Sequence, residues 1–441
     1  MPIVTKVAHL LQSLLGPLAE EIAREVPIIK RRRKFSASLL AQTFVLGFLA
    51  KRRPSDEDLA RMAQRCGVDV TTQAVEQRVT SDLAAFLEAL FRRAVRCRVQ
   101  ADEAVVPLVQ RFPAVLLHDS TSIALPDELG ERFPGCGGSH DRGLAAIKLQ
   151  VRLDLRDGGL DTVAIEAGRD CDQRTPTQLD ALPPGSLRIA DLGFFDSKVF
   201  RQMGDQGVFW ISRLAFGTEI MTPSCEPIGP LAGLFEGTAR VIDREVLIGK
   251  QAKLACRLVM WRVPAEVANR RRQKLIATAR DKGNVPPSRK RLDWCDWAIF
   301  VTNVPSEGLS VEEIGVLYRA RWQIELMFKR WKSLGGIAEM TGSTVVRQLV
   351  GLWSSLLAVL VQQWMLQASG WGDRRCSHHK AWEVIRDQAT HLAKALGCLD
   401  DLVGSIDEVR RTLGKTARRD KRKQPGTFEL LADPSRLGYE A

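Results

Sequence analysis

Residues 318–332 read Tyr-Arg-Ala-Arg-Trp-Gln-Ile-Glu-Leu-Met-Phe-Lys-Arg-Trp-Lys. At about 100° per residue, one face of a helix over this stretch would carry a phenol, a carboxylate and three cations. These residues are Tyr318, Arg321, Glu325, Lys329 and Lys332. A carboxylate can hold a hard cation through oxygen, and Arg and Lys beside it can bind phosphate groups. A solvated face with ion pairs such as Glu325 with Lys329 is the alternative, and the stretch alone does not choose between the two.

Two further carboxylates follow short apolar stretches that are typical of buried strands. Residues 114–118 precede Asp119, and residues 187–190 precede Asp191. We therefore expect each aspartate to lie at the end of a strand. Asp is also common in turns and helix caps, which explains either aspartate taken alone. Two such aspartates followed by a glutamate on a helix instead indicate three carboxylates that meet at one edge of a sheet.

The chain resembles the transposases of the insertion-sequence-four type, which are DDE enzymes with a ribonuclease-H-like fold. The resemblance rests on Asp119-Ser120-Thr121, on Asp191-x-Gly193-Phe194 and on the spacing Tyr318-x2-Arg321-x3-Glu325-x6-Lys332. Four polar residues at fixed spacing are a specific signal. The similarity extends from about residue 35 to about residue 430. Phe194 departs from the family pattern, where Tyr is frequent, but it keeps the aromatic ring.

The expected fold is α/β and multi-domain, with a ribonuclease-H-like mixed sheet that is flanked by helices and interrupted by a mostly β insertion. The expected segments are a helical DNA-binding region (1–110), the first part of the catalytic core (111–213), the β-rich insertion (214–297), the second part of the core (298–370) and a helical C-terminal region with a basic tail (371–441).

Local patterns give more detailed expectations within these segments. We expect strands at 147–155, 160–165, 208–213, 237–242, 245–248, 255–263 and 298–302, and helices at 175–182, 196–204, 345–366, 377–397 and 400–412. The apolar helix at 345–366 is expected to pack on the sheet. Ser310 is expected to cap the helix that leads into residue 318.

Residues 56–80 resemble a helix-turn-helix, because two helical stretches flank Gly67 and Thr71 can cap the second. Side chains on that second helix could reach base edges or phosphates, and the candidates are Gln73, Gln77 and Arg78. An ordinary helical hairpin explains the pattern equally well. Arg213 ends an expected strand and is a further candidate for phosphate contact.

The carboxylates suggest two-metal chemistry. Two divalent cations about 3.5–4 Å apart can activate an attacking oxygen and stabilise a leaving one. We therefore assign two Mg²⁺ ions, which Mn²⁺ could replace, to Asp119, Asp191 and Glu325. Tyr318, Arg321, Lys329 and Lys332 would hold phosphate oxygens of a transposon end.

The resulting hypothesis is a DNA transposase that binds the ends of its insertion sequence and catalyses metal-dependent cleavage and strand transfer. The resemblance further implies cut-and-paste movement through a hairpin end, two subunits assembled on DNA, and an insertion in which a Trp supports a flipped base. Candidates for that Trp are Trp261, Trp294 and Trp297. The alternatives are a metal-dependent nuclease without strand transfer and an inactive DNA-binding repressor.

Charge and hydropathy agree with a DNA partner. The net charge is +12, and its clusters at 30–34, 51–53, 269–274, 289–291 and 410–423 predict a long phosphate-binding track. The apolar run at 349–361 is too short to span a bilayer. Charged residues interrupt the N-terminal 27 residues, so we expect no signal peptide. A bacterial, cytoplasmic and nucleoid-associated protein is therefore expected.

Overall fold

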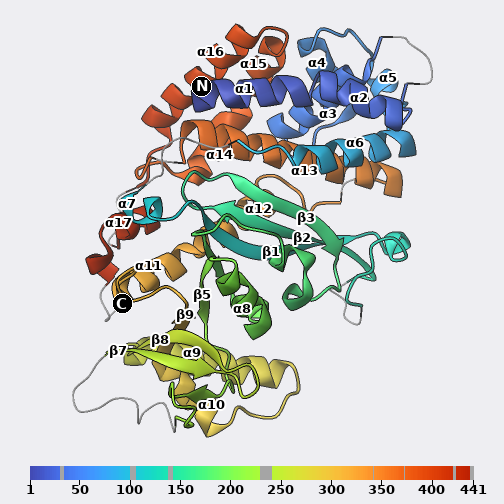
Figure 1. Cartoon of the computed structure of the whole chain (residues 1–441). Helices are drawn as coiled ribbons and strands as arrows, with labels where there is room; N and C mark the ends of the chain where they lie inside the picture. The colour runs from blue at the N-terminus through green and yellow to red at the C-terminus, as the bar shows by residue number, and fades with distance from the viewer. Residues whose placement is uncertain are drawn as a thin grey trace. The chain divides into compact units, whose positions relative to one another are not determined.

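The structure is a computed structural model, and it describes residues 1–29, 34–99, 106–137, 143–228, 241–340, 342–371, 373–420 and 424–437. The chain forms two compact units, and Figure 1 labels most of their elements. Unit 1 consists of Met1–Val105, Asp119–Asp170 and Gln323–Lys423, and unit 2 of Val106–His118, Cys171–Trp322 and Gln424–Ala441. The five-segment division expected from the sequence stays a prediction.

Unit 1 is largely helical. Its helices are α1 (Ile3–Leu14), α2 (Pro17–Glu25), α3 (Ala37–Ala50), α4 (Asp56–Arg65), α5 (Thr72–Glu76), α6 (Ser81–Ala94), α12 (Trp322–Ser333, with Trp322 counted in unit 2), α13 (Val345–Ser369), α14 (His378–Asp387), α15 (Ala389–Ala395) and α16 (Leu399–Thr416). The expected helix at 377–397 is therefore two helices that are separated at Gln388.

Helix α13 is the central helix of unit 1 (Figure 1). It packs against α1, α3, α6, α14 and α16, so the expectation that it packs mainly on the sheet is wrong. A helix that is apolar on all sides is suited to this position, because every face is covered. By length and composition alone α13 could cross a membrane, but 94% of its most apolar window is buried inside the protein.

Unit 1 also contains the predicted hairpin. Strands β2 (Ala145–Asp154) and β3 (Leu160–Ala167) pair in antiparallel fashion. The turn between them needs glycine at residue 158, where φ is +77° and a Cβ atom would lie 2.3 Å from the Trp371 ring. Gln363 of α13 donates a hydrogen bond to the Gly158 carbonyl (2.7 Å), which fixes the turn on the helical part of the unit.

Strand β1 (Val115–Leu125) is longer than expected. The sequence predicts that it ends at Asp119, but it continues for six more residues. Residues 121, 123 and 125 are buried and alternate with exposed ones, which is the pattern of a half-buried strand. Asp119 therefore lies within the strand, and the prediction that it ends the strand is wrong.

Unit 2 contains most of the sheet. Its further strands are β4 (Leu187–Ala190), β5 (Phe209–Arg213), β6 (Ile220–Met221), β7 (Val241–Ile248), β8 (Leu254–Arg262) and β9 (Trp297–Thr302). β1 pairs with β4 and β4 with β5 in parallel, whereas β5–β9, β9–β8, β8–β7 and β7–β6 pair in antiparallel fashion. The hydrogen-bonded order of all nine strands is β3-β2-β1-β4-β5-β9-β8-β7-β6, so the prediction of a mixed α/β fold is confirmed.

The helices of unit 2 are α7 (Pro107–Gln110), α8 (Ser197–Asp205), α9 (Ala265–Asp281), α10 (Arg289–Asp293), α11 (Val311–Ala320) and α17 (Thr427–Ala432). Buried residues of β5, β7, β8 and β9 share one apolar core with α8. Ser310 caps α11 through a capping box with Glu313, as predicted. Strand β5 and helix α8 also lie where the sequence predicts them.

Two expected elements are wrong. The expected helix at 175–182 is only a 3-10 turn, Pro176–Gln178, in which the Thr175 hydroxyl accepts from the Thr177 amide. The insertion is not mostly β, because its basic stretch forms the 17-residue helix α9 and the short helix α10. Strand β7 runs without interruption from Val241 to Ile248, where the sequence predicts two separate strands, at 237–242 and 245–248. The expected strand at 237–242 lies partly outside the described residues.

Candidate functional site

Asp191 directly follows β4, as predicted. It is half-buried and begins a 3-10 turn, in which its Oδ1 accepts a hydrogen bond from the Gly193 amide (2.8 Å). A Cβ atom at Gly193 would lie 3.0 Å from the same oxygen. Glycine at this position therefore lets the backbone approach the carboxylate and orient it.

Asp119 directly follows His118, which pairs with β4, the strand that precedes Asp191. In the parallel register of β1 and β4, His118 lies opposite Ala190, and the two aspartates are the next residues along their strands. The Oδ1 atom of Asp119 accepts a hydrogen bond from the Ser120 amide (2.8 Å). Each aspartate is thus oriented by a backbone amide.

A buried polar network in unit 2 lies directly before the two aspartates in the chain. Arg188 of β4 contacts His118 Nδ1 (2.9 Å) and donates to Gln178 Oε1 (2.8 Å). The Thr177 hydroxyl is 3.2 Å from His118 Nε2. Phe194 covers the group, with its ring centroid 4.4 Å from that of His118. The network connects the ends of two parallel strands with the turn that carries Asp191.

The sequence reasoning did not identify Arg188. One available signal is an arginine inside the otherwise apolar four-residue strand β4, since a fully buried Arg needs several hydrogen-bond acceptors. The side chain of His118 is fully buried.

Tyr318 lies between two arginines in unit 2. The guanidinium carbons of Arg213 and Arg321 are 5.6 Å and 5.8 Å from the centroid of its ring, which is a cation–π arrangement. The ring of Phe300, on β9, contacts the Tyr318 ring, with the two ring centroids 4.9 Å apart. Burial raises the pKa of the phenol, although Arg213 and Arg321 act in the opposite direction and Asp191 adds to the rise. Tyr318 therefore stays a neutral hydrogen-bond donor.

The single helix expected over 318–332 is interrupted. Helix α11 ends at Ala320 and α12 begins at Trp322, with Arg321 between them in a helical backbone conformation. Arg321 donates its amide to the Tyr318 carbonyl, a three-residue bond that tightens the chain at this point. The expectation of one uninterrupted helix face is therefore wrong.

Glu325, Lys329 and Lys332 lie on α12 in unit 1. Glu325 and Lys332 are half-buried, and Lys329 is exposed. Burial lowers the pKa of Lys332 from its ordinary value. A lysine amine that loses hydration in this way gains more from an anionic partner than a fully solvated one does.

The predicted site residues are distributed over both units. Unit 1 contains Asp119, Glu325, Lys329 and Lys332, and unit 2 contains Asp191, Arg213, Tyr318 and Arg321. Within the described part of the chain, no group of three or more His, Cys, Asp or Glu side chains forms a metal site. The joint role of the three carboxylates therefore stays a prediction. As donors they fit a hard divalent cation, because carboxylate oxygens are its preferred ligands.

The predicted helix-turn-helix region contains α4, a turn at Gly67 and α5. Thr71 caps α5, with its hydroxyl accepting from the Ala74 amide (3.2 Å), as expected. Helix α5 has only five residues, however, so it is shorter than predicted. Gln73 and Gln77 are exposed. Arg78 is half-buried over the Phe35 ring at 5.9 Å.

The three candidate tryptophans differ in their surroundings. Trp261 is buried against Phe300 (5.1 Å) and is a core residue. Trp294 is partly exposed and meets the exposed Phe216 edge-on at 5.4 Å. Trp297 is also partly exposed and lies under the Arg262 guanidinium at 5.3 Å. These contacts favour Trp294 and Trp297 over Trp261 for stacking with a base.

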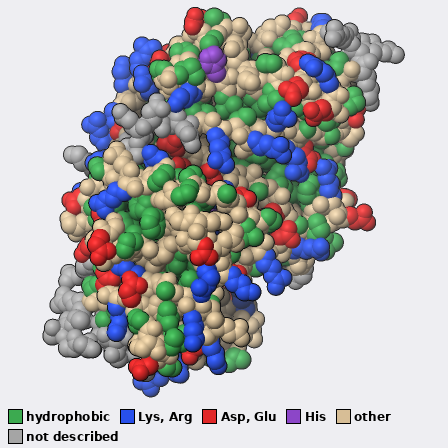
Figure 2. Space-filling model, in the orientation of Figure 1, with side chains coloured by type: hydrophobic (Ala, Val, Ile, Leu, Met, Phe, Trp, Pro, Cys, Tyr) green, Lys and Arg blue, Asp and Glu red, His purple; other side chains and the backbone are tan. Residues whose placement is uncertain are grey.

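The basic clusters are partly described. Lys and Arg side chains occur on the face of each unit in view, with acidic side chains among them (Figure 2). Residues 30–33 and 421–423 of two clusters lie outside the described residues. The continuous phosphate-binding track therefore stays a prediction.

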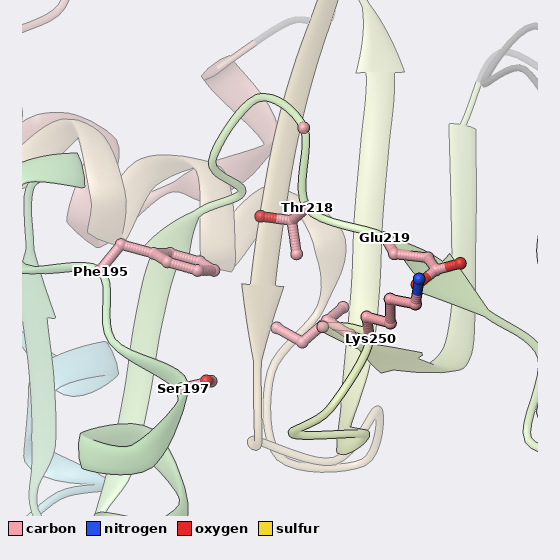
Figure 3. A pocket seen from close by; sticks show the side chains of 8 residues that line it. Phe195, Ser197, Thr218, Glu219 and Lys250 are labelled. Atoms are coloured by element: carbon pink, nitrogen blue, oxygen red, sulfur yellow. The ribbon is translucent and has the colours of Figure 1, made fainter.

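A hollow of about 590 Å³ opens in unit 2 near the segment that follows Asp191 (Figure 3). Phe195 and Thr218 point toward each other across it, and Lys250 extends alongside Glu219 (Figure 3). The full lining is Phe195, Ser197, Gly217, Thr218, Glu219, Ile248, Gly249 and Lys250. Its lysine and glutamate carry opposite charges, so the lining does not select an anion, and we assign it no part in phosphate contact.

Comparisons with known proteins identify the family. A sequence profile of the transposase DDE domain matches residues 110–361, more than half of the chain. The transposase for insertion sequence element IS231F of Bacillus thuringiensis subsp. israelensis is 27% identical over 455 residues, which cover 96% of this chain and 94% of the relative. That for IS231B of subsp. berliner is 28% identical over 460 residues (96% and 93%). That for IS1151 of Clostridium perfringens is 26% identical over 269 residues (57% and 56%). The chain therefore belongs to the DDE transposases, of the insertion-sequence-four type.

Proposed function

We propose that this transposase binds the ends of its own insertion sequence, cleaves them, and joins them to a target in a cut-and-paste route through a hairpin end. The observation that carries the assignment is the parallel register of β1 and β4. His118 of β1 pairs with Ala190 of β4. Asp119 is the residue after His118, and Asp191 is the residue after Ala190. The shared register supports a common role for the two carboxylates.

Asp119, Asp191 and Glu325 would hold the divalent metal ions that DDE domains generally use, and we propose two Mg²⁺ ions, with Mn²⁺ able to replace them. Carboxylate donors fit these ions, because hard cations prefer oxygen ligands. When bound, two such ions activate the attacking oxygen and stabilise the leaving oxygen in a phosphodiester displacement.

The cationic residues would position the DNA strand. Arg213, Tyr318, Arg321, Lys329 and Lys332 would bind phosphate oxygens beside the scissile bond, with Tyr318 donating from its neutral phenol. In the first step, a water oxygen bonds to phosphorus, and the bond from phosphorus to the 3′-oxygen breaks. In the second step, the released 3′-hydroxyl attacks another phosphodiester, which exchanges one phosphorus–oxygen bond for another.

The N-terminal region and the assembly complete the proposal. Gln73, Gln77 and Arg78 would contact base edges or phosphates of the terminal repeat. Two copies would act together on DNA, since each end of the element must be cut before both are joined to one target. A partly exposed tryptophan of the insertion, Trp294 or Trp297, would stack on a flipped base. The protein would act in the bacterial cytoplasm, on the nucleoid.

The test uses the purified full chain, labelled duplexes taken from the DNA that flanks its coding region, and Mg²⁺. Strand-transfer products would support the proposal, whereas cut ends alone would indicate a nuclease. Retardation of the duplex without cleavage would indicate a repressor. Glu325→Gln should abolish cleavage and preserve DNA retention, while joint loss of folding and retention would assign Glu325 a structural role.

A further inference from the structure

A third arginine of unit 2 is held at the start of β9, the strand whose Phe300 contacts the Tyr318 ring. Arg271 lies on α9 of the insertion and is half-buried. Its Nη1 atom donates hydrogen bonds to the carbonyl oxygens of Trp297 (3.0 Å) and Cys295 (3.4 Å). These bonds fix its guanidinium group at the start of β9.

Strand β9 connects this position to Arg213. Three residues after Trp297, Phe300 pairs with Arg213 in the register of β5 and β9, and its ring contacts Tyr318. Leu214, the residue directly after β5, donates its amide to the Ile299 carbonyl (3.3 Å). The electrostatics agree with this proximity, because burial and then the charge of Arg213 lower the pKa of Arg271.

The neighbouring arginine on α9 has a different environment. Arg272 pairs with Asp296, and it also donates to Asn269 Oδ1 (2.8 Å). Among the described residues, the hydrogen-bond partners of Arg271 are the two backbone carbonyls alone. Among those residues no carboxylate therefore balances its charge, and Arg213 lowers its pKa while Cys295 acts in the opposite direction.

A half-buried arginine that has no carboxylate partner among the described residues, and whose pKa is lowered by a second arginine, is stabilised when an anion binds it. The planar guanidinium group has five N–H donors, and Arg271 uses only Nη1 on the protein. The remaining donors suit a two-point bond to phosphate oxygens. The protein bonds thus orient the group before any ligand arrives.

We propose that Arg271 binds a backbone phosphate of the transposon end, next to the phosphates held by Arg213, Tyr318 and Arg321. This deepens the proposed function and rests on it. The ligand class is the phosphodiester of a DNA strand, contacted without reading its sequence. Through this contact the insertion would grip the same strand end that enters the catalytic part of the chain.

A purely structural role is the competing explanation, since the two carbonyl bonds also fasten α9 to β9. Arg271→Gln separates the roles, because glutamine keeps an N–H donor and removes the charge. Arg271→Ala removes both. Arg280→Ala is the matched control, since Arg280 lies on the same helix and its side chain is 83% exposed. Its ion pair with Asp281 is long (3.8 Å) and solvent-exposed, so the pair contributes little.

The experiment measures binding of the full-length variants to the flanking-DNA duplex at several salt concentrations, together with thermal unfolding. We expect Arg271→Gln and Arg271→Ala to bind about tenfold more weakly. The slope of log affinity against log salt should decrease by about one. Arg280→Ala should match the wild type. Single methylphosphonate substitutions should locate one phosphate whose neutralisation weakens the wild type but not Arg271→Gln.

Wild-type affinity and salt slope in both Arg271 variants would overturn the inference. The inference would also be overturned if Arg271→Ala bound more weakly while Arg271→Gln bound as tightly as the wild type. The hydrogen bonds to the carbonyl oxygens, and not the charge, would then explain the loss. Failure of the wild type to bind and cut the duplex would instead count against the proposed function. The two failures are therefore distinguishable.

Discussion

The guanidinium carbon of Arg213 lies 5.6 Å from the centre of the Tyr318 ring, so the last residue of β5 covers the phenol near the end of α11. The ring is 8% exposed, and Arg321 approaches it as well. Burial keeps the phenol neutral by raising its pKa. A neutral phenol beside two cations can donate a hydrogen bond to an anion without adding a negative charge.

Tyr318→Phe tests this relationship through pH. The folded-state pKa of Tyr318 is raised above its unfolded value. Its stabilisation is therefore present below about pH 10 and is lost as pH rises through the folded pKa. Above about pH 10, we expect the unfolding temperature of the wild type to fall more steeply with pH than the unfolding temperature of Tyr318→Phe. At neutral pH, the phenylalanine variant should bind the DNA end several-fold more weakly. Parallel unfolding profiles would contradict the assignment.

Lys332 should make DNA binding sensitive to pH. Burial lowers its pKa, and phosphate binding favours the charged amine. Affinity for the DNA end should therefore fall as pH rises through that lowered pKa, before ordinary lysines titrate near about 10.4. Lys332→Arg should remove this early decline, because arginine stays charged. Binding isotherms between about pH 7 and about pH 10 would show the difference, and identical profiles would exclude Lys332 from the contact.

Gly193→Ala should reduce cleavage more than binding. A Cβ atom would lie 3.0 Å from Asp191 Oδ1, so the carboxylate must shift. Small displacements of reacting groups cost up to about a hundredfold in rate, and we expect a loss of roughly tenfold to a hundredfold. Gly204→Ala is the control, since its Cβ atom would meet only Asn303 Nδ2 at 3.7 Å. Equal cleavage rates in the two variants would contradict this role for Gly193.

Arg188→Met should destabilise unit 2. The change removes contacts to His118 Nδ1 and Gln178 Oε1 inside the core, and buried acceptors left without donors are costly. We expect the free energy of unfolding in urea to fall by about 2–4 kcal/mol. Arg174→Met, at an exposed position, should change it by less than about 0.5 kcal/mol. Similar effects of the two substitutions would contradict the stabilising role of the network.

Local signals predicted several elements correctly. The hairpin of β2 and β3, helix α8, strand β5 and the Ser310 cap follow from periodicity, turn glycines and capping residues, which act over a few positions. Asp191 was placed after its strand for the same reason. The strand at Asp119 was cut too short, because a change from continuous to alternating burial resembles a strand end. Whether burial along a strand is continuous or alternating depends on the elements that pack on each face of the sheet, and these elements are distant in sequence.

Longer-range effects explain the remaining errors. The basic stretch over α9 contains good helix formers, but the strands around it suggested a β region. The interruption at Arg321 breaks no periodic pattern in residues 318–332, so sequence spacing could not reveal it. Arg188 was missed, and Arg271 was predicted only as a member of the 269–274 cluster, because the significance of each lies in partners from other elements. His118 and Trp297 are far from them in sequence.

Each of the two units is built from several separate segments of the chain, so a shortened copy of the protein would lack part of at least one unit. The boundaries fall after residues 105, 118, 170, 322 and 423. A premature stop directly before residue 323 therefore removes α12 to α16 from unit 1, while unit 2 loses only its last short segment, and an earlier stop shortens both units. Partial gene copies should thus be inert remnants rather than independently folding fragments, and domain-by-domain expression should fail for the same reason.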